Sequence, residues 1–315
     1  MHAVVYRVYA AGFVLAATLA ATAPSFAQTP PGYSYRPQIV IISIDGLRPD
    51  AISDATTPTL MGVARRGTHT FKADTVTPSE TTPSHASMLS GYLPKTHRIT
   101  WDGWIPERGL IGVPTLLSTA RQAGFQTVMV VGKHKLQHIA PEGGRFLSMP
   151  ANDDVIVNEA MVWAGTGSDI LFVHLPEVDL TGHAKGWMSP EYMARVAATD
   201  RAIARLLPAL PFNATIIITA DHGGMGIDHG AERDQNIKIP WIATGPSIAT
   251  GRVLMGAVKT VDTAATAARI LGLILPADIA GKPITDAILP MPVYYPDVLS
   301  DPREEPSTYL TPRVR

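Results

Sequence analysis

Residues 39–46 read IVIISIDG, and this stretch decides the fold class. The run Ile39–Ile44 is almost wholly apolar and rich in β-branched residues, which predicts a strand buried on both faces, as in the middle of a parallel sheet. Asp45 and Gly46 follow directly and predict a turn. The carboxylate of Asp45 is therefore expected at the carboxyl end of a central strand.

Three further apolar runs repeat this plan of a buried strand followed by residues capable of chemistry. Because parallel strands end at one edge of a sheet, the side chains that follow them are expected to lie close together. The runs and their followers are Thr127–Val131 before Gly132, Ile170–Leu175 before Asp179, and Thr215–Thr219 before Asp221 and His222.

Helical signals separate these strands. A helix is expected from Thr57–Pro58 to near Gly67, another over 114–123, and a long amphipathic one after Ser189–Pro190. Thr or Ser at the N-cap followed by Pro favours a helix start. Strands that alternate with helices predict an α/β fold, a doubly wound, mostly parallel sheet with helices on both faces. Such a sheet binds its ligands outside the carboxyl ends of the strands.

One catalytic domain is expected to account for most of the chain. The 315 residues are 46% apolar, which suffices for one sizeable α/β core. Residues 1–27 contain an early Arg, an apolar stretch and a small-x-small triplet ending at Ala27, the layout of a cleaved secretory signal. We expect a Pro-rich leader over 28–37, the catalytic domain over 38–285 and an irregular tail over 286–315.

Composition narrows the partners and the compartment. The net charge is −1 and no long basic run occurs, which argues against a nucleic-acid polymer or an anionic membrane as partner. A small molecule is the expected partner, and the oligomeric state is left open. There is no Cys, so any metal must be held by His and carboxylates. The expected address is a bacterial periplasm or the external medium, with no stable membrane anchor after signal cleavage.

Four separated motifs carry the chemistry. Each alone is commonplace, since Asp-Gly after a strand is usually a turn. Together they supply three carboxylates, three imidazoles and a hydroxyl, each after an apolar strand of one predicted sheet. This mixture suits two divalent cations flanking a phosphoryl group. The motifs are Ile44–Gly46, Thr81–His85, Asp179–His183, and Asp221–Gly223 with His229–Gly230.

From about Ile39 to Gly281 the chain resembles the alkaline phosphatase superfamily, and within it the type I phosphodiesterase and nucleotide pyrophosphatase branch. In that branch a nucleophilic Thr or Ser is followed at the second position by Pro and at the fourth by His, which Thr81, Pro83 and His85 match. The resemblance implies an alkaline phosphatase-like fold. It also implies a two-metal hydrolase of phosphate diesters or pyrophosphates, with Thr81 forming a covalent phospho-threonine intermediate.

The resemblance also implies a partition of the metal ligands. Three imidazoles favour zinc over Mg²⁺, which prefers oxygen ligands. A hydroxyl bound to a dication loses its proton easily, which would activate Thr81 without a dedicated base. One metal is expected on Asp179, His183 and His229, and the other on Asp45, Thr81, Asp221 and His222.

Two features depart from the branch. The residue after its nucleophile is commonly a Phe that stacks on a nucleobase, whereas here it is Thr82. An Asn that contacts a phosphate oxygen is replaced by Asp102. A carboxylate there repels phosphate unless it is protonated or paired. Asp102 could therefore turn away, or be neutralised by a cation such as Arg98 or Lys133, and we retain it as a candidate substrate contact.

Lys133 and Lys135 follow a strand and resemble the paired-lysine segment of phosphonoacetate hydrolases. Two cations would suit a more anionic substrate, so both are candidate substrate contacts. The alternative is that they are solvated loop charges, the usual state of Lys on a surface.

Two further functions stay open. One is a phosphomonoesterase or phosphonoacetate-type hydrolase, and the other is an inactive, metal-holding binding protein of the envelope. Sulfatases of the superfamily are disfavoured because they need Cys or Ser, then Pro, then Arg at the nucleophile motif. His85 is expected to be a structural residue at the start of a helix. The remaining histidines are expected to be structural or surface groups: His69, His97, His134, His138 and His174.

Overall fold

The computed structural model describes residues 38–290 of the chain. The predicted signal 1–27, the leader 28–37 and residues 291–315 of the predicted tail lie outside this part. The first residues of the tail pack on the domain, since Leu289 N donates a hydrogen bond to Ser247 O. None of the helices between 38 and 290 is long and apolar enough to cross a membrane.

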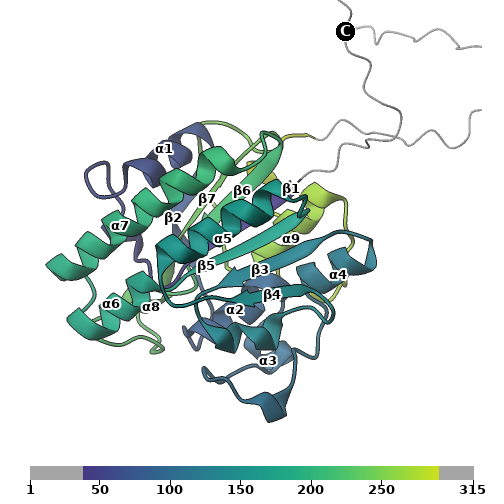
Figure 1. Ribbon diagram of the computed structural model, residues 1–315, viewed down its shortest axis with the longest axis horizontal. Helices are drawn as coiled ribbons and strands as arrows, with labels where there is room; N and C mark the ends of the chain where they lie inside the picture. Colours follow the sequence, from purple (N-terminus) through teal and green to yellow (C-terminus); the bar gives the residue numbers. More distant parts are fainter. Residues whose placement is uncertain (1–37, 291–315) are drawn as a thin grey trace, which may run out of the picture. The chain divides into compact units, whose positions relative to one another are not determined.

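An eight-stranded mixed sheet forms the centre of the described residues, in the order β4-β3-β5-β1-β6-β7-β2-β8 (Figure 1). The five strands from β4 to β6 are all parallel, β7 runs antiparallel to both β6 and β2, and β8 is parallel to β2. The strand bounds are β1 Gln38–Ile44, β2 Thr68–Asp74, β3 Thr127–Val131, β4 Arg145–Ser148, β5 Ile170–Leu175, β6 Ala214–Thr219, β7 Lys238–Thr244 and β8 Arg252–Val253.

Helices pack on both faces of this sheet (Figure 1). Helix α5 lies against β3 and β5, α1 against β7, and α7 against α1, α5 and α6. In a second group of helices, α9 lies against β1 and α4 lies against β3. Helix α2 packs on both α9 and α4. The helix bounds are α1 Pro58–Arg66, α2 Thr81–Ser90, α3 Pro94–His97, α4 Leu116–Gln122, α5 Asp153–Gly165, α6 Glu177–Lys185, α7 Pro190–Leu206, α8 Asp234–Ile237 and α9 Asp262–Leu271. Short 3₁₀ turns occur at Pro49–Ala51, Pro106–Arg108, His134–Ile139, Leu207–Ala209 and Thr285–Ala287.

The local signals act largely as expected. Ser189 caps α7 by accepting a hydrogen bond from Tyr192 N, with Pro190 at the first helical position. The helix expected over 114–123 begins two residues later, because Thr115 is its N-cap and forms a capping box with Ser118. The cap of α1 comes from a distant residue, since both Asp200 oxygens accept from Thr59 N and Leu60 N.

Strand β1 is the core of the sheet. Each of its seven residues is buried, and it pairs with β5 on one side and β6 on the other. Burial of a side chain the size of Ile39 or Ile41 contributes about 1.5–3 kcal/mol. Because β1, β3, β5 and β6 are parallel, their carboxyl ends open onto the same edge of the sheet. The predicted site residues follow these strands at that edge.

Candidate metal centre

Two groups of three side chains lie at this edge with their ligand atoms within 4.8 Å of one another. We call Asp45, Asp221 and His222 the inner trio, because all three are fully buried after β1 and β6. Asp179, His183 and His229 are called the outer trio, because His183 on α6 is exposed and His229 lies half-buried before α8. The structure thus brings together all six predicted charged or imidazole ligands, in the two predicted groups.

Within each trio the imidazole Nε2 atoms face carboxylate oxygens. His222 Nε2 lies 3.3 Å from Asp45 Oδ1 and 3.4 Å from Asp221 Oδ2. His183 Nε2 and His229 Nε2 lie 3.5 Å and 3.7 Å from Asp179 Oδ1. The trios are neighbours, since His222 Nε2 is also 4.0 Å from Asp179 Oδ1.

The opposite nitrogen of each of these histidines is held by the backbone. Nδ1 lies 2.7 Å from Gly223 O in His222, 2.9 Å from Ile227 O in His183, and 2.9 Å from Ser79 O in His229. A carbonyl can only accept, so each Nδ1 carries the proton and donates it. Once such a ring holds no second proton, it presents the Nε2 lone pair, as metal-binding histidines do.

Four buried polar atoms of the trios have no hydrogen-bond partner within the described residues: Asp45 Oδ1, Asp179 Oδ1, Asp221 Oδ2 and His222 Nε2. Each unpaired buried polar group costs about 1–3 kcal/mol. Oxygen and imidazole donors grouped in this way suit a divalent cation of the zinc type. The residues present therefore fit the metals that the sequence predicted.

The inner trio has strongly perturbed electrostatics. Burial raises the pKa of Asp221 to about 8, and Asp45 adds to that shift. For His222 the effect of burial is outweighed by Asp221 and Asp45, which raise its pKa to about 10. Burial opposes ionisation of Asp45 too, but the Lys133 ammonium and the hydrogen bond from His174 hold its pKa well below the usual range. In the outer trio, burial and nearby His222 lower the pKa of His229 to about 4.

Thr81 is the first residue of α2 and is fully buried. His85, one turn later, donates from Nδ1 to Thr81 O at 2.7 Å and lies 2.8 Å from Ser43 Oγ through Nε2. It also lies 3.5 Å from Asp221 Oδ2. His85 therefore holds the first turn of α2 against β1, which is a structural role, as the sequence predicted.

Lys133 lies between the two trios. Its Nζ is 2.6 Å from both Asp45 Oδ2 and Asp179 Oδ2, and it donates to Thr81 Oγ1 at 3.2 Å. These carboxylates outweigh burial and raise the pKa of Lys133. The alternative that Lys133 is a solvated loop charge is wrong, because its side chain is only 14% exposed.

Asp102 is paired, although with neither of the cations suggested by the sequence. Its Oδ2 lies 2.7 Å from Lys135 Nζ, and its Oδ1 accepts from Thr82 N at 2.9 Å and from Thr82 Oγ1 at 3.1 Å. Burial would raise the pKa of Asp102, but Lys135 lowers it below the usual value. The carboxylate therefore contacts Thr82, the residue after the predicted nucleophile. Its cationic partner is Lys135, and not Arg98 or Lys133 as the sequence suggested.

Trp187 holds α6 and the loop before α8 together. Its Nε1 donates to Gly46 O at 2.9 Å and its backbone N donates to Gly226 O at 2.7 Å. A Cβ at Gly224 would lie 2.1 Å from the indole, and one at Gly182 would lie 2.6 Å from it. The two glycines therefore let His183 and His229 approach the same carboxylate, and sequence analysis gave Trp187 no role.

The other histidines lie outside both trios. His69 bonds Ala64 O, His97 bonds Ser87 Oγ, His138 accepts from Ile105 N, and the exposed His134 packs on Trp104. His174 is different, because it contacts a member of the inner trio, Asp45, at 2.8 Å. Sequence analysis grouped it with the structural histidines, although it lies five residues before Asp179 on a predicted central strand.

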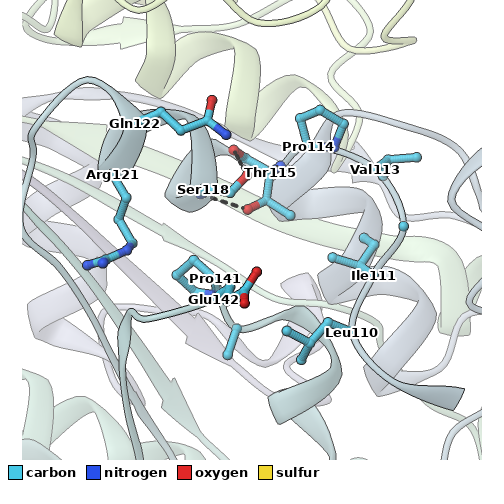
Figure 2. Close-up of a pocket in the computed structure, with 12 residues that line it drawn as sticks. Leu110, Ile111, Val113, Pro114, Thr115, Ser118, Arg121, Gln122, Pro141 and Glu142 are labelled. Carbon is cyan, nitrogen blue, oxygen red and sulfur yellow. Dashed lines mark hydrogen bonds between the residues drawn. The ribbon is translucent and has the colours of Figure 1, made fainter.

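A hollow of about 670 Å³ lies between residues 110–115, helix α4 and residues 140–142 (Figure 2). Thr115 and Ser118 of the α4 capping box face it, together with Arg121 and Glu142. No member of either trio contributes to its lining, so we assign it no part in the chemistry of the metal centre.

A family model described as type I phosphodiesterase / nucleotide pyrophosphatase matches residues 39–122 and 142–244, more than half of the chain. The chain belongs to this family. The match includes Asp45, Thr81, Asp179, Asp221 and His229. The segment that carries Lys133 and Lys135 lies between the two matched stretches.

Curated relatives of this family member are distant and longer. An uncharacterised pyrophosphatase/phosphodiesterase of Schizosaccharomyces pombe is 24% identical over 60% of this chain and 45% of its own length. Human ectonucleotide pyrophosphatase/phosphodiesterase family member 7 is 27% identical over 62% of this chain and 49% of its own. The chain spans less than half the length of these relatives.

Solved structures show the same fold, which is alkaline phosphatase-like. Murine ectonucleotide pyrophosphatase/phosphodiesterase 5 superposes with a TM-score of 0.69 at 13% identity, over 80% of this chain and all of that one. A 2-O GAG sulfatase superposes with a TM-score of 0.64 at 18% identity, over 80% and 74% of the two chains. At such identities the likeness establishes the fold alone.

Proposed function

We propose that the chain is a metal-dependent hydrolase of phosphate diesters or pyrophosphates, with residues 38–285 as its phosphoesterase domain. The observation that carries this is the arrangement of three imidazoles, each donating Nδ1–H to a carbonyl and presenting Nε2 to unpaired carboxylate oxygens. Family membership supports the reaction class. The proposed substrate is a small-molecule phosphate ester.

The inner trio with Thr81 would hold one divalent cation, and the outer trio the other. Such cations, for which three imidazoles favour zinc, would ease loss of the Thr81 proton and offset charge on the phosphoryl and leaving oxygens. The murine relative supports the choice of nucleophile, since an inactive Thr-to-Ala variant of it was captured with AMP.

Thr81 performs the covalent step. Its hydroxyl gives up a proton to solvent, an Oγ–P bond forms, and the P–O bond to the leaving group breaks as that group takes a proton from water. Water then adds its oxygen to phosphorus, the Oγ–P bond breaks, and Thr81 regains a proton. His85 holds the carbonyl of Thr81 throughout, which keeps the nucleophile at the start of α2.

A second candidate, a phosphomonoesterase or phosphonoacetate-type hydrolase, is favoured by the two ammonium groups. Lys133 Nζ is 3.2 Å from Thr81 Oγ1, where it could contact phosphoryl oxygens. Lys135 is held beside Thr82 by Asp102. An extra negative charge on a monoester needs a nearby cation to replace its hydration. We propose Lys133 and Lys135 as substrate contacts, with Asp102 acting through Lys135.

We also propose that the protein is exported through cleavage of residues 1–27. The signal-like layout of that segment supports this, as do relatives whose names place them outside cells, an ectonucleotide enzyme and a venom phosphodiesterase. Mass spectrometry of the secreted or periplasmic protein would test it, and a chain that keeps residues 1–27 would contradict it.

The test of function is hydrolysis of chromogenic diester and monoester substrates by the purified protein, before and after chelation. Chelation should abolish turnover and zinc should restore it. Metal counting should show one position lost selectively in Asp179→Ala, His183→Ala and His229→Ala, and the other in Asp45→Ala, Asp221→Ala and His222→Ala. Full activity without metal would overturn the proposal, and metal binding without turnover of any ester would point to the inactive binding protein.

A further inference from the structure

We propose that His174 is a positioning residue that fixes the Asp45 carboxylate so that one of its oxygens faces the inner metal position. This inference rests on the proposed function. It concerns a residue outside both trios and makes no use of the nucleophile.

The sheet register places His174 beneath the site. It is the penultimate residue of β5 and pairs in register with Ser43 of β1 on one side and Val131 of β3 on the other. Residues paired in register point to the same face of a sheet. Ser43 contacts His85 of α2, and the rings of His85 and His174 meet edge to face at 5.0 Å. His174 is therefore enclosed between the sheet and α2, with no exposed surface.

Hydrogen bonding determines which nitrogen of His174 carries the proton. Gly132 N donates to Nδ1 at 3.3 Å, so Nδ1 is the acceptor and the proton sits on Nε2. Nε2 then donates to Asp45 Oδ2 at 2.8 Å. This is the reverse of the arrangement in His183, His222 and His229, which donate from Nδ1 to backbone carbonyls and turn Nε2 toward carboxylate oxygens. His174 therefore orients a metal ligand, Asp45, and is not itself a metal ligand.

The two oxygens of Asp45 are divided by this contact. Oδ2 receives His174 and the ammonium of Lys133, while Oδ1 has no hydrogen-bond partner and lies 3.3 Å from His222 Nε2. A carboxylate turns readily about its terminal torsion. A donor on a rigid central strand prevents that rotation better than a long Lys side chain can. Hydrogen bonds from outer residues orient metal ligands in this way, and their loss typically weakens metal affinity about 10–100-fold.

His174 does this without adding a charge. Its Nδ1 accepts from Gly132 N, so the ring holds a single proton, on Nε2, and is neutral. A charged ring would add a second cation to this carboxylate beside Lys133, whereas a neutral donor only orients it. The competing explanation is that His174 merely fills space between β5 and α2, in which case any side chain of similar volume should serve.

A matched pair of variants separates these explanations. Gln presents an amide N–H at about the place of Nε2, and Met has similar volume and flexibility but no donor. We expect His174→Met to lose at least tenfold in zinc affinity at the inner position, and His174→Gln to stay within about threefold of wild type. Zinc affinity is measured by competition with a chromogenic chelator, which needs no substrate. His138→Met, at a buried His that contacts Gly109 O and no trio member, is the control and should bind zinc as wild type does.

Each outcome decides the matter. Unchanged inner-site affinity in His174→Met, or equal losses in the Met and Gln variants, would overturn the positioning role. Should His174→Met fail to fold, as judged by thermal unfolding of the metal-free protein, His174→Asn replaces it, since Asn offers no donor at the Nε2 position. Wild-type protein that binds no zinc would instead refute the proposed function, so the two failures are distinguishable.

Discussion

Raising the pH from 6 to 8 should tighten zinc binding at the inner trio far more steeply than at the outer trio. The difference comes from the protons that each trio holds before metal arrives. In the inner trio the pKa of His222 is raised to about 10 and that of Asp221 to about 8, so this pair retains at least one proton at neutral pH. In the outer trio the pKa of His229 is lowered to about 4, so its Nε2 is already free.

The sign and size follow from competition between proton and metal. A proton that must leave on binding makes the apparent affinity rise about tenfold per pH unit until the pH exceeds the pKa of the group. Over two units the inner position should therefore gain about 100-fold, or about 2.7 kcal/mol, for one proton displaced. The proton on His229 makes no such contribution to the outer position in the same interval.

Titration calorimetry in buffers of different ionisation enthalpy measures the zinc affinity and the number of protons that are released when zinc binds. His183→Ala isolates the inner trio and His222→Ala isolates the outer trio, so each slope is read from a protein with one intact position. At pH 7 the first variant should release at least one proton per zinc and the second markedly fewer. Buffer-independent enthalpies for His183→Ala, or equal slopes in both variants, would refute the electrostatic reasoning.

Three further outcomes are expected. Thr81→Ala should reduce turnover roughly 10³-fold or more in steady-state assays, whereas Thr82→Ala should cost much less, and the reverse order would move the nucleophile by one residue. Replacing Lys133 and Lys135 by Ala should reduce monoester turnover about tenfold more than diester turnover, and equal small losses would deny a substrate contact. Burial raises the pKa of Asp153 to about 6, so stability is lost as the pH rises from about 4 to 6. Asp153→Asn should then add about 2 kcal/mol at pH 7 and little at pH 4 in urea unfolding, and a gain that does not depend on pH would contradict this.

The parallel half of the sheet could be predicted because its strands are buried on both faces. Continuous apolar runs gave β1, β3, β5 and β6 to within one residue at each end. Strands β2, β4, β7 and β8 were not predicted. Strand β2 reads THTFKAD and is only partly buried, β7 contains Pro240, and β4 and β8 are short edge strands. Their pairing depends on partners far away in the sequence, which local pattern does not reveal.

The extent of helix α2 was not predicted, although His85 was expected at the start of a helix. All ten of its residues are buried, yet six of them are Thr, Ser or His, so no apolar stripe marks an amphipathic helix in the sequence. The residues of the two trios could be named because their motifs follow predicted strands and match those of the family that the chain resembles. The hydrogen bonds of their imidazoles could not be predicted, since the partners are backbone carbonyls, which every residue has. These carbonyls belong to Gly223, Ile227 and Ser79. The pairing of Asp102 with Lys135 spans 33 residues and likewise needs the folded chain.

Because Trp187 packs against Gly182 and Gly224, the residues that are tolerated at these three positions depend on one another. Alanine at Gly224 would place a methyl carbon 2.1 Å from the indole, which no small adjustment of a buried ring can accommodate. A change at Gly182 or Gly224 is therefore tolerable only after Trp187 has become smaller, and a smaller residue at 187 first leaves a void beneath His183 and His229. Each single step is harmful although the combined change need not be. Libraries that randomise the loop before α8 should consequently vary positions 182, 187 and 224 together, because sampling them one at a time would make this part of the site look immutable.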